Sequence, residues 1–276
     1  AHITWASHVD METGRPVETA GARYEGTSNT GLAFPGPIGG HNWHPMSYSP
    51  DTGLVYIPVQ DAPTVYAQDL NFKHRKGFWN TGTDMVPAVL PEDPATKQEV
   101  LDSITGAILA WDPVAGQPRW RVDHRGPWNG GILSTAGNLV LQGNAEGEFV
   151  AYNATDGSQL WSMDAQTGIV APPMTYRVNG TQYIAVLAGW GGSMALVGGE
   201  GLRAGPIPNR SRLLVFRLGG KLQLPPAVDE ELIISPPELT ASADQVAAGQ
   251  KVFLQYCVFC HGDGAVSGGA TPDLRA

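Results

Sequence analysis

The C-terminal part of the chain carries its only two cysteines, in the stretch "CVFCH" that ends at His261. A structural zinc site would need a second pair of Cys or His ligands at compatible spacing, and none follows. A thioredoxin-like redox pair is expected after a strand in a βαβ unit, whereas the residues before this motif have a helical pattern. Covalent attachment of haem c fits best. Cys257 and Cys260 would then form the thioethers, and His261 would be an axial ligand of the haem iron.

A helix is predicted to lead into this motif. Ser242 and Gln245 have the spacing of a capping box. Small or apolar residues then recur at helical spacing, at Val246, Gly249, Val252, Phe253 and Tyr256. Haem attachment of this type implies export, so the mature protein is expected in the periplasm, although residues 1–25 show no signal peptide.

A second candidate for chemistry is "GPIGGHNWHPMSYSP", from Gly36 to Pro50, which places His41, Asn42, Trp43 and His44 in succession. In a β-propeller, loops that feed the inner strands line an axial channel in which a planar ligand can bind. A histidine pair of this kind can equally be a satisfied feature of a turn, and both interpretations stay open for His41 and His44.

The elements that must position these residues include an internal repeat. The stretch "GAILAWDPVAGQPRW" ends at Trp120, and "GEFVAYNATDGSQLW" ends at Trp161, 41 residues later. Each copy predicts a strand, a turn rich in Asp, Pro or Gly, and a strand opening on Trp. A period of about 40 residues is typical of propeller blades. Each tryptophan is expected to pack on the neighbouring blade and to donate its indole N–H to a backbone carbonyl.

Other segments extend the β pattern. The stretch 47–61 is predicted to belong to an earlier blade, and 174–192 to form a hairpin that turns at Asn179-Gly180. With 35 glycines, 22 prolines and 8 tryptophans, the composition favours short strands and turns over long helices. The fold class is therefore predicted as all-β. About three blades of a propeller are expected, too few to close a ring.

The chain divides into three predicted parts. Residues 1–218 would form propeller blades, 219–240 a proline-rich linker, and 241–276 the start of a cytochrome c domain. Fifteen residues follow His261, and none is Met, so this domain is expected to be truncated. The net charge of -9 and the absence of a basic stripe argue against a nucleic-acid surface. No apolar run approaches the roughly 20 residues that span a bilayer, so the chain is predicted not to be transmembrane.

Together these motifs resemble the pyrroloquinoline quinone (PQQ) dependent quinohaemoprotein alcohol dehydrogenases. The resemblance rests on "GGHNWHPMSYSPDTGLVYIP", "ILAWDP", "PWNGGILSTAGNLVLQGNAEGEFVAYNATDGSQLW", "GWGGS" and "CVFCHG", in that order, and covers the whole chain. It implies an eight-bladed propeller that holds PQQ and calcium on its axis, followed by a cytochrome c domain. The sequence would then be an internal fragment of a longer polypeptide, containing the last blades, the linker and the first haem helix.

The resemblance also implies site residues. Asn42 and Trp43 match the family's Asn-Trp pair that contacts PQQ, and the segment 190–193 matches a final-blade loop that closes over the cofactor, with a backbone contact expected at Ser193. The general-base Asp and the calcium ligands have no counterpart here and are expected upstream, so no catalytic residue is assigned. The fragment alone is expected to be inactive.

The implied activity is oxidation of alcohols to aldehydes with PQQ, with electrons passing to haem c and then to a downstream cytochrome, copper protein or quinone. The linker must dock the cytochrome over the propeller mouth, while Trp128 and the loop 65–91 are candidate walls of the pocket for a small alcohol. One alternative is a PQQ enzyme for another substrate class, such as a sugar, a polymeric alcohol or an amine-ring substrate. The other is a propeller-cytochrome module that transfers electrons without catalysis.

Overall fold

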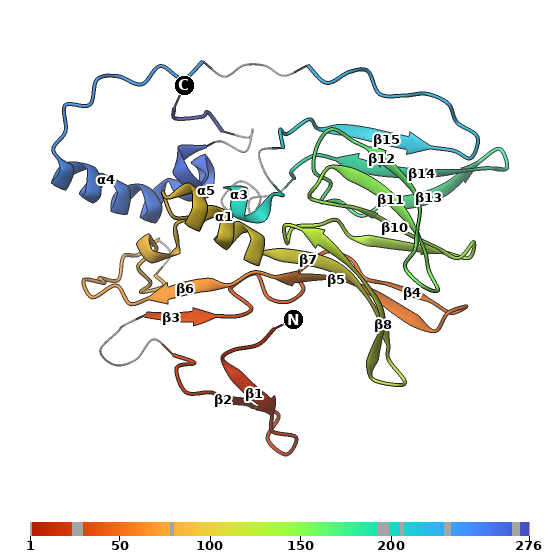
Figure 1. Ribbon diagram of the computed structural model, residues 1–276, viewed down its shortest axis with the longest axis horizontal. Coiled ribbons are helices and arrows are strands. Elements are labelled where there is room, and N and C mark those ends of the chain that lie inside the picture. Colours follow the sequence, from red (N-terminus) through yellow and green to blue (C-terminus); the bar gives the residue numbers. More distant parts are fainter. Residues whose placement is uncertain are drawn as a thin grey trace.

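The computed structural model describes residues 2–23, 30–77, 80–191, 199–204, 207–228, 233–266 and 271–275. Three larger antiparallel sheets follow one another along the chain and stack in that order (Figure 1). The first, in the order β4-β5-β7-β8, consists of Ser47–Ser49, Leu54–Asp61, Thr105–Asp112 and Gln117–Arg125. The second contains β9 Ile132–Thr135, β10 Leu139–Gly143, β11 Glu148–Asn153 and β12 Gln159–Asp164, and the third β13 Met174–Val178, β14 Thr181–Ala188 and β15 Arg212–Phe216.

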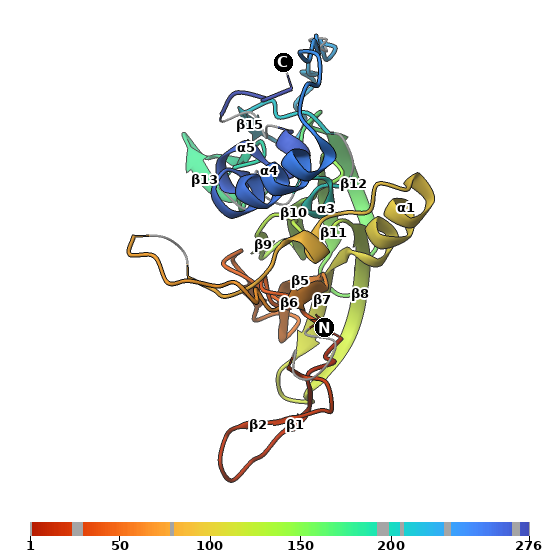
Figure 2. The same ribbon diagram turned by 90° about the vertical axis from the view of Figure 1, so that its left-hand side faces the viewer.

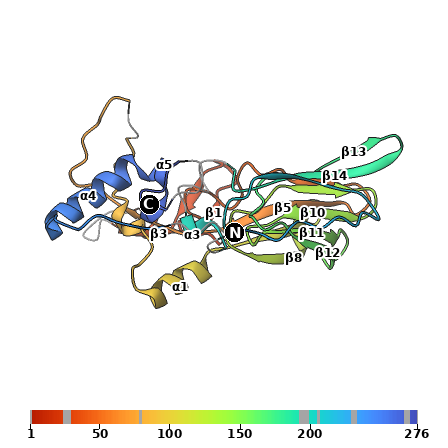
Figure 3. The ribbon, with the colours of Figure 1, turned by 90° about the horizontal axis from the view of Figure 1, so that it is seen from above.

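Smaller elements surround these sheets. Two further antiparallel pairs join β1 Ala6–Val9 to β2 Pro16–Glu18 and β3 Thr30–Ala33 to β6 Thr64–Ala67. The helical elements are η1 Val86–Ala88, α1 Pro94–Ser103, α3 Gly199–Leu202, α4 Ala243–Tyr256, α5 Val258–His261 and η2 Asp263–Ala265. Seen from above, the helices gather at one end of the molecule and the three sheets at the other (Figure 3). The mainly β character predicted from the composition is confirmed.

The second sheet is apolar on both faces, which explains why the three sheets stack. Side chains alternate between the two faces of a strand. In β11, Val150 and Tyr152 enter a core shared with Tyr56 and Ile108 of the first sheet. Their neighbours Phe149 and Ala151 enter a second core, shared with β14 and β15 of the third sheet. The near-continuous apolar run of this strand therefore serves two interfaces.

Trp120 joins the first sheet to the second, as the repeat predicted. Its indole Nε1–H donates to the carbonyl of Ala154 over 3.1 Å. Its ring lies against Gly157, where an added Cβ would stand 2.7 Å from Trp120 Cε3. The repeat-related Trp161 differs, because it meets an aromatic cluster: its ring packs edge-on against Phe149 and Phe216 and remains 43% exposed.

The observed strand pairing and the observed strand starts correct two expectations from the sequence. The segment 47–61 does not belong to an earlier blade, because β5 pairs with β7 from Val55–Trp111 to Asp61–Thr105 and completes the same sheet. The second strand of each repeat also begins before its tryptophan, at Gln117 and Gln159. The hairpin prediction is confirmed, since both residues of the turn between β13 and β14 have positive φ.

The linker leaves the third sheet in an extended conformation and crosses to the helical end (Figure 1). Two side chains hold it near its start: Gln166 Nε2 donates to the carbonyl of Pro225, and Arg210 Nη2 donates to that of Val228. Helix α4 then begins with the predicted capping box, in which Ser242 and Gln245 exchange both hydrogen bonds. In the described part of the chain, no helix is long and apolar enough to cross a membrane.

Candidate functional site

The end of α4 places the two thiols and the histidine of the C-x-x-C-H motif within little more than one helical turn. Cys257 is the C-terminal cap of α4, and Cys260 and His261 lie in α5. Both cysteines are free thiols; Cys257 is half-buried and Cys260 is exposed. Two accessible thiols on one short helical segment meet the geometric requirement for double attachment to a prosthetic group.

The ring orientation of His261 is fixed by a hydrogen bond to the segment that follows the motif. Nδ1 lies 3.0 Å from the carbonyl oxygen of Pro272, an acceptor that requires Nδ1 to carry the proton. The lone pair is then on Nε2, the atom that a metal would bind. Thr271 also donates its hydroxyl to the carbonyl of Cys260, which ties the same segment to the motif. These contacts fit an axial ligand of haem iron.

The second predicted site begins with the turn at Asn42 and Trp43. The Asn42 amide donates from Nδ2 to the carbonyl of Ile38 and accepts at Oδ1 from the backbone N–H of Trp43, each over 2.8 Å. An Asn amide has a second N–H and a second lone pair, so it can still bind a ligand. The Trp43 side chain is 56% exposed, and this turn presents it to a cavity.

The imidazole of His44 lies beneath Trp43 and is buried from solvent. His44 is 1% exposed and stacks on Trp43, with ring centroids 4.3 Å apart and an interplanar angle of 23°. Its other neighbour is Trp128, edge-on at 4.6 Å. Burial lowers the pKa of His44 to about 4, helped by the nearby His41, so the ring is neutral at pH 7. His44 is therefore a buried support for Trp43, while His41 satisfies Nδ1 at the carbonyl of Pro58.

The cavity at Trp43 joins this turn to the final sheet. It has a volume of about 440 Å³, within the range of small-molecule sites. Its other walls come from the segment 170–172, from Leu187, Ala188, Gly189 and Gly191, and from Ser211 and Arg212. Among the described residues, an added Cβ at Gly191 would meet nothing within 4 Å, so a ligand can approach this backbone closely. The aromatic side chain of Trp43 and the two glycines are groups that suit a flat ligand.

The structure brings together some of the predicted residues and not others. Trp43, Gly189 and Gly191 share the cavity although they are far apart in sequence, whereas Asn42 is not among its lining residues. The C-x-x-C-H motif lies at the helical end (Figure 1). Ser193 falls outside the described residues. Trp128 is 1% exposed within a core that includes Ile38 and Trp190, so its predicted role as a pocket wall is wrong. Ser211 and Arg212 were not predicted, because no motif marks them.

The resemblance predicts a calcium ion whose ligands are expected upstream. Among the described residues, no group of three or more His, Cys, Asp or Glu side chains could hold a metal ion. Calcium in proteins is bound by several oxygen ligands. Calcium therefore stays a prediction from the resemblance, which places its ligands upstream.

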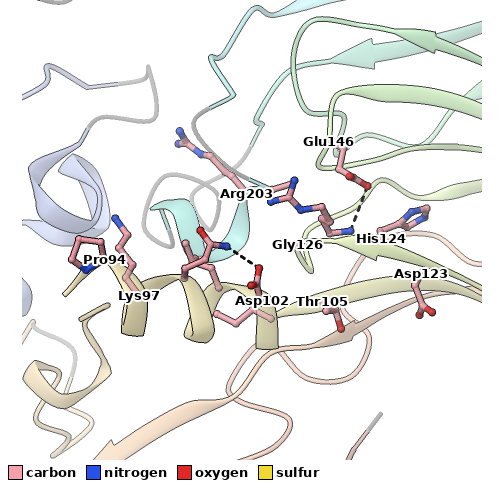
Figure 4. A pocket seen from close by; sticks show the side chains of 15 residues that line it. Pro94, Lys97, Asp102, Thr105, Asp123, His124, Gly126, Glu146 and Arg203 are labelled. Atoms are coloured by element: carbon pink, nitrogen blue, oxygen red, sulfur yellow. Dashed lines mark hydrogen bonds between the residues drawn. The ribbon is translucent and has the colours of Figure 1, made fainter. Parts of the chain in front are cut away.

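A larger cavity of about 800 Å³, which no sequence motif predicts, lies between α1, the end of β8 and α3 (Figure 4). Its lining is charged with both signs, by Lys97, Asp102, Asp123, Arg125, Glu146 and Arg203. The Arg203 guanidinium lies 5.5 Å from the ring of Trp190, and burial lowers its pKa. His124 is buried at the same wall, where its Nε2 bonds Gln142 Oε1 over 2.9 Å. No single ligand chemistry dominates this mixed lining.

Comparison with known proteins places this geometry in context. Residues 93–184 match the model of the glucose/ethanol/alcohol dehydrogenase β-propeller domain of PQQ proteins. The chain is 49% identical, over 99% of its length and 38% of the relative's, to quinohemoprotein alcohol dehydrogenase ADH IIB of Pseudomonas putida. It is 44% identical, over 99% of its length and 38% of the relative's, to the dehydrogenase subunit of the quinone-dependent alcohol dehydrogenase of Gluconacetobacter polyoxogenes. The chain thus spans well under half the length of these relatives.

Solved structures agree with the sequence matches. Quinohemoprotein alcohol dehydrogenase ADHIIG of Pseudomonas putida HK5 superposes with a TM-score of 0.88 at 38% identity, over 99% of this chain and 40% of that one. The Comamonas testosteroni quinohemoprotein alcohol dehydrogenase gives a TM-score of 0.74 at 37% identity, over 95% and 37% of the two chains. The resemblance predicted from the motifs is confirmed.

Proposed function

We propose that this chain, which resembles part of the quinohaemoprotein alcohol dehydrogenases over its whole length, forms one wall of a PQQ site and the haem attachment segment of an alcohol-oxidising enzyme. One observation carries the proposal. Trp43, Gly189 and Gly191 line the same cavity of about 440 Å³. The motif that would receive the electrons lies on the same chain, with His261 already oriented by Pro272.

The chain's own residues would bind and orient the two cofactors. When bound, PQQ supplies the oxidising chemistry for an alcohol, and haem accepts the electrons singly. Trp43 would cover one face of the quinone, held flat by the buried His44. Asn42 would donate its remaining N–H to a quinone oxygen, while Cys257 and Cys260 form thioethers and the lone pair of His261 Nε2 binds iron.

The remaining parts of the activity are proposed from the resemblance alone. A calcium ion and a general-base Asp would come from residues outside this chain and act on a small alcohol. The cytochrome part would pass electrons to a further cytochrome, a copper protein or a quinone. Because haem of this type is attached after export, we propose a periplasmic location, with residues 219–240 as the linker between propeller and cytochrome.

Haem attachment is tested first. The full encoded polypeptide, expressed with a cytochrome maturation system, should carry haem that survives denaturation and stains on a gel. The pair Cys257→Ala and Cys260→Ala should abolish this stain. Lys251→Ala, an exposed change on the same helix, is the matched control and should retain it. A stain that persists without both thiols contradicts the thioether assignment.

Alcohol oxidation is tested on the same polypeptide loaded with PQQ and calcium. Alcohol-dependent reduction of a dye is expected. Activity with sugars but with no simple alcohol would assign the enzyme to another substrate class. Asn42→Asp preserves the acceptor for the Trp43 N–H but removes both amide donors, so PQQ should be retained more weakly during gel filtration. Undiminished PQQ retention in this variant would refute the role given to Asn42.

A further inference from the structure

Helix α4 contacts the propeller at the end that carries the haem motif. Nη1 of Arg75, in the loop 68–85 between β6 and η1, donates a hydrogen bond to the hydroxyl of Tyr256. The same guanidinium lies 5.6 Å from the centroid of the Tyr256 ring, a cation–π distance. Tyr256 is the last residue of α4 and is bonded directly to Cys257. Two interactions of one arginine therefore reach the residue beside the first predicted thioether.

The loop presents Arg75 in a fixed position. The backbone N–H of Arg75 donates to Asn80 Oδ1, and Asn80 Nδ2 donates to the carbonyl of Arg75, each over 2.8 Å. This reciprocal pair imitates the pairing of two strands and holds the backbone of Arg75. In the side and top views α4 lies between this loop and α1 (Figures 2 and 3). Arg75 is thus a constrained contact on an exposed loop.

A second set of contacts restrains the other side of the connection. Gln166 and Arg210 fasten the linker at Pro225 and Val228, before it crosses to α4. These anchors limit how far α4 can move but leave its direction open, because more than ten residues separate Val228 from the start of the helix at Ala243. An extended segment of that length can reach many positions. Contacts at the far end of α4, where Leu254 and Val258 are also buried, select one of them.

We infer that Arg75 is a positioning residue that docks the haem-bearing end of α4 on the loop 68–85, and so fixes where the haem stands relative to the propeller. The inference rests on the proposed function, since it assigns a purpose to the haem segment. An exposed cation–π pair and one hydrogen bond from a charged donor together favour the docked state by roughly 30-fold or more. Loss of Arg75 should release α4 without affecting the attachment chemistry.

The experiment measures the position of α4 directly. In the haem-loaded polypeptide the native thiols are occupied, so introduced cysteines can be spin-labelled selectively. Val114→Cys, at the 96% exposed turn between β7 and β8, and Lys251→Cys, on the exposed face of α4, give one distance across the contact. Pulsed electron resonance should show a single narrow distribution with Arg75 present. Arg75→Ala should broaden it and raise the population at longer distances by about 30-fold.

Two variants make the result specific. Lys73→Ala removes a cation from the same loop and should leave the distribution narrow. Tyr256→Phe removes the hydroxyl but retains the ring, so its distribution should lie between those of the parent and Arg75→Ala. A distribution unchanged by Arg75→Ala overturns the inference. The haem stain separates this failure from that of the proposed function: stain with unchanged distances rejects only the docking role, whereas absence of stain in the parent rejects the haem segment itself.

Discussion

The carbonyl of Ala154 offers a quantitative test of how adjacent sheets are joined. It is fully buried and accepts two hydrogen bonds from the first sheet, from Trp120 Nε1 over 3.1 Å and from the Tyr56 hydroxyl over 2.9 Å. Trp120→Phe removes one donor and Tyr56→Phe the other, and each replacement keeps an aromatic ring. Either single change leaves the carbonyl with one partner. Tyr56→Phe also removes the partner of the Thr52 hydroxyl, and Trp120→Phe shortens the ring that packs on Gly157, so each should cost about 1–2 kcal/mol of unfolding free energy.

The double variant should cost more than the sum. With both donors gone, the Ala154 carbonyl is buried without a partner, which adds a penalty of about 1–3 kcal/mol. The expected total is about 3–7 kcal/mol, with a coupling energy of about 1–3 kcal/mol between the two positions. Urea titrations of the four proteins, followed by circular dichroism, give this coupling from a double-mutant cycle.

Trp161→Phe serves as the matched control, because the Trp161 indole packs on the rings of Phe149 and Phe216 and, among the described residues, its N–H has no hydrogen bond to a carbonyl. It should cost less than Trp120→Phe and show no coupling to Tyr56→Phe. Strict additivity of Trp120→Phe and Tyr56→Phe would refute the view that one shared carbonyl joins the two sheets.

Two further predictions concern residues near the cavity at Trp43. His44 has a pKa of about 4 in the folded chain, against an ordinary value of 6.5. Between these pH values the unfolded chain binds more protons than the folded chain. The free energy of unfolding should therefore fall as the pH drops from 6.5 to 4, by up to about 3 kcal/mol. His44→Gln should flatten this dependence of stability on pH, measured by urea titrations at several pH values. An unchanged dependence would contradict the burial argument. Burial also lowers the pKa of His124, which contributes equally in both proteins. Gly168→Ala would place a Cβ 2.3 Å from Trp190 Cζ2 and should destabilise by about 1–3 kcal/mol, measured by thermal unfolding, whereas Gly249→Ala in α4, with nothing within 4 Å, should be neutral or stabilising.

Local features were predictable because neighbouring residues determine them. The capping box at Ser242 and the Asn179-Gly180 turn depend on a few adjacent side chains, and both occur as predicted. The repeat also indicated correctly that Trp120 would donate to a carbonyl of the next sheet. In each case the pattern carries its own physical reason, so no distant partner had to be known.

The errors involve partners far apart in the sequence. The sequence assigns the segment 47–61 to an earlier blade, but its strand pairs with β7 across an insertion that contains η1 and α1. The prediction of Trp128 as a pocket wall fails because this side chain packs with Ile38, Ala62 and Trp190 from three other segments. The larger cavity draws on α1, β8 and α3, which share no motif. Long-range contacts decide such positions, and a single sequence does not contain them.

The residues around Trp43 suit the binding of a cofactor better than the transfer of protons. Around Trp43 the chain offers an aromatic face, close backbone and a neutral imidazole, which are groups for holding a flat molecule rather than for moving protons. Because the pKa of His44 is about 4, this support does not change its charge near neutral pH. Under the proposed function, His44 should therefore not set the pH dependence of alcohol oxidation. His44→Gln should leave the pH profile of the loaded enzyme unshifted even where it alters stability, and a shifted profile would show that the imidazole takes part in proton transfer.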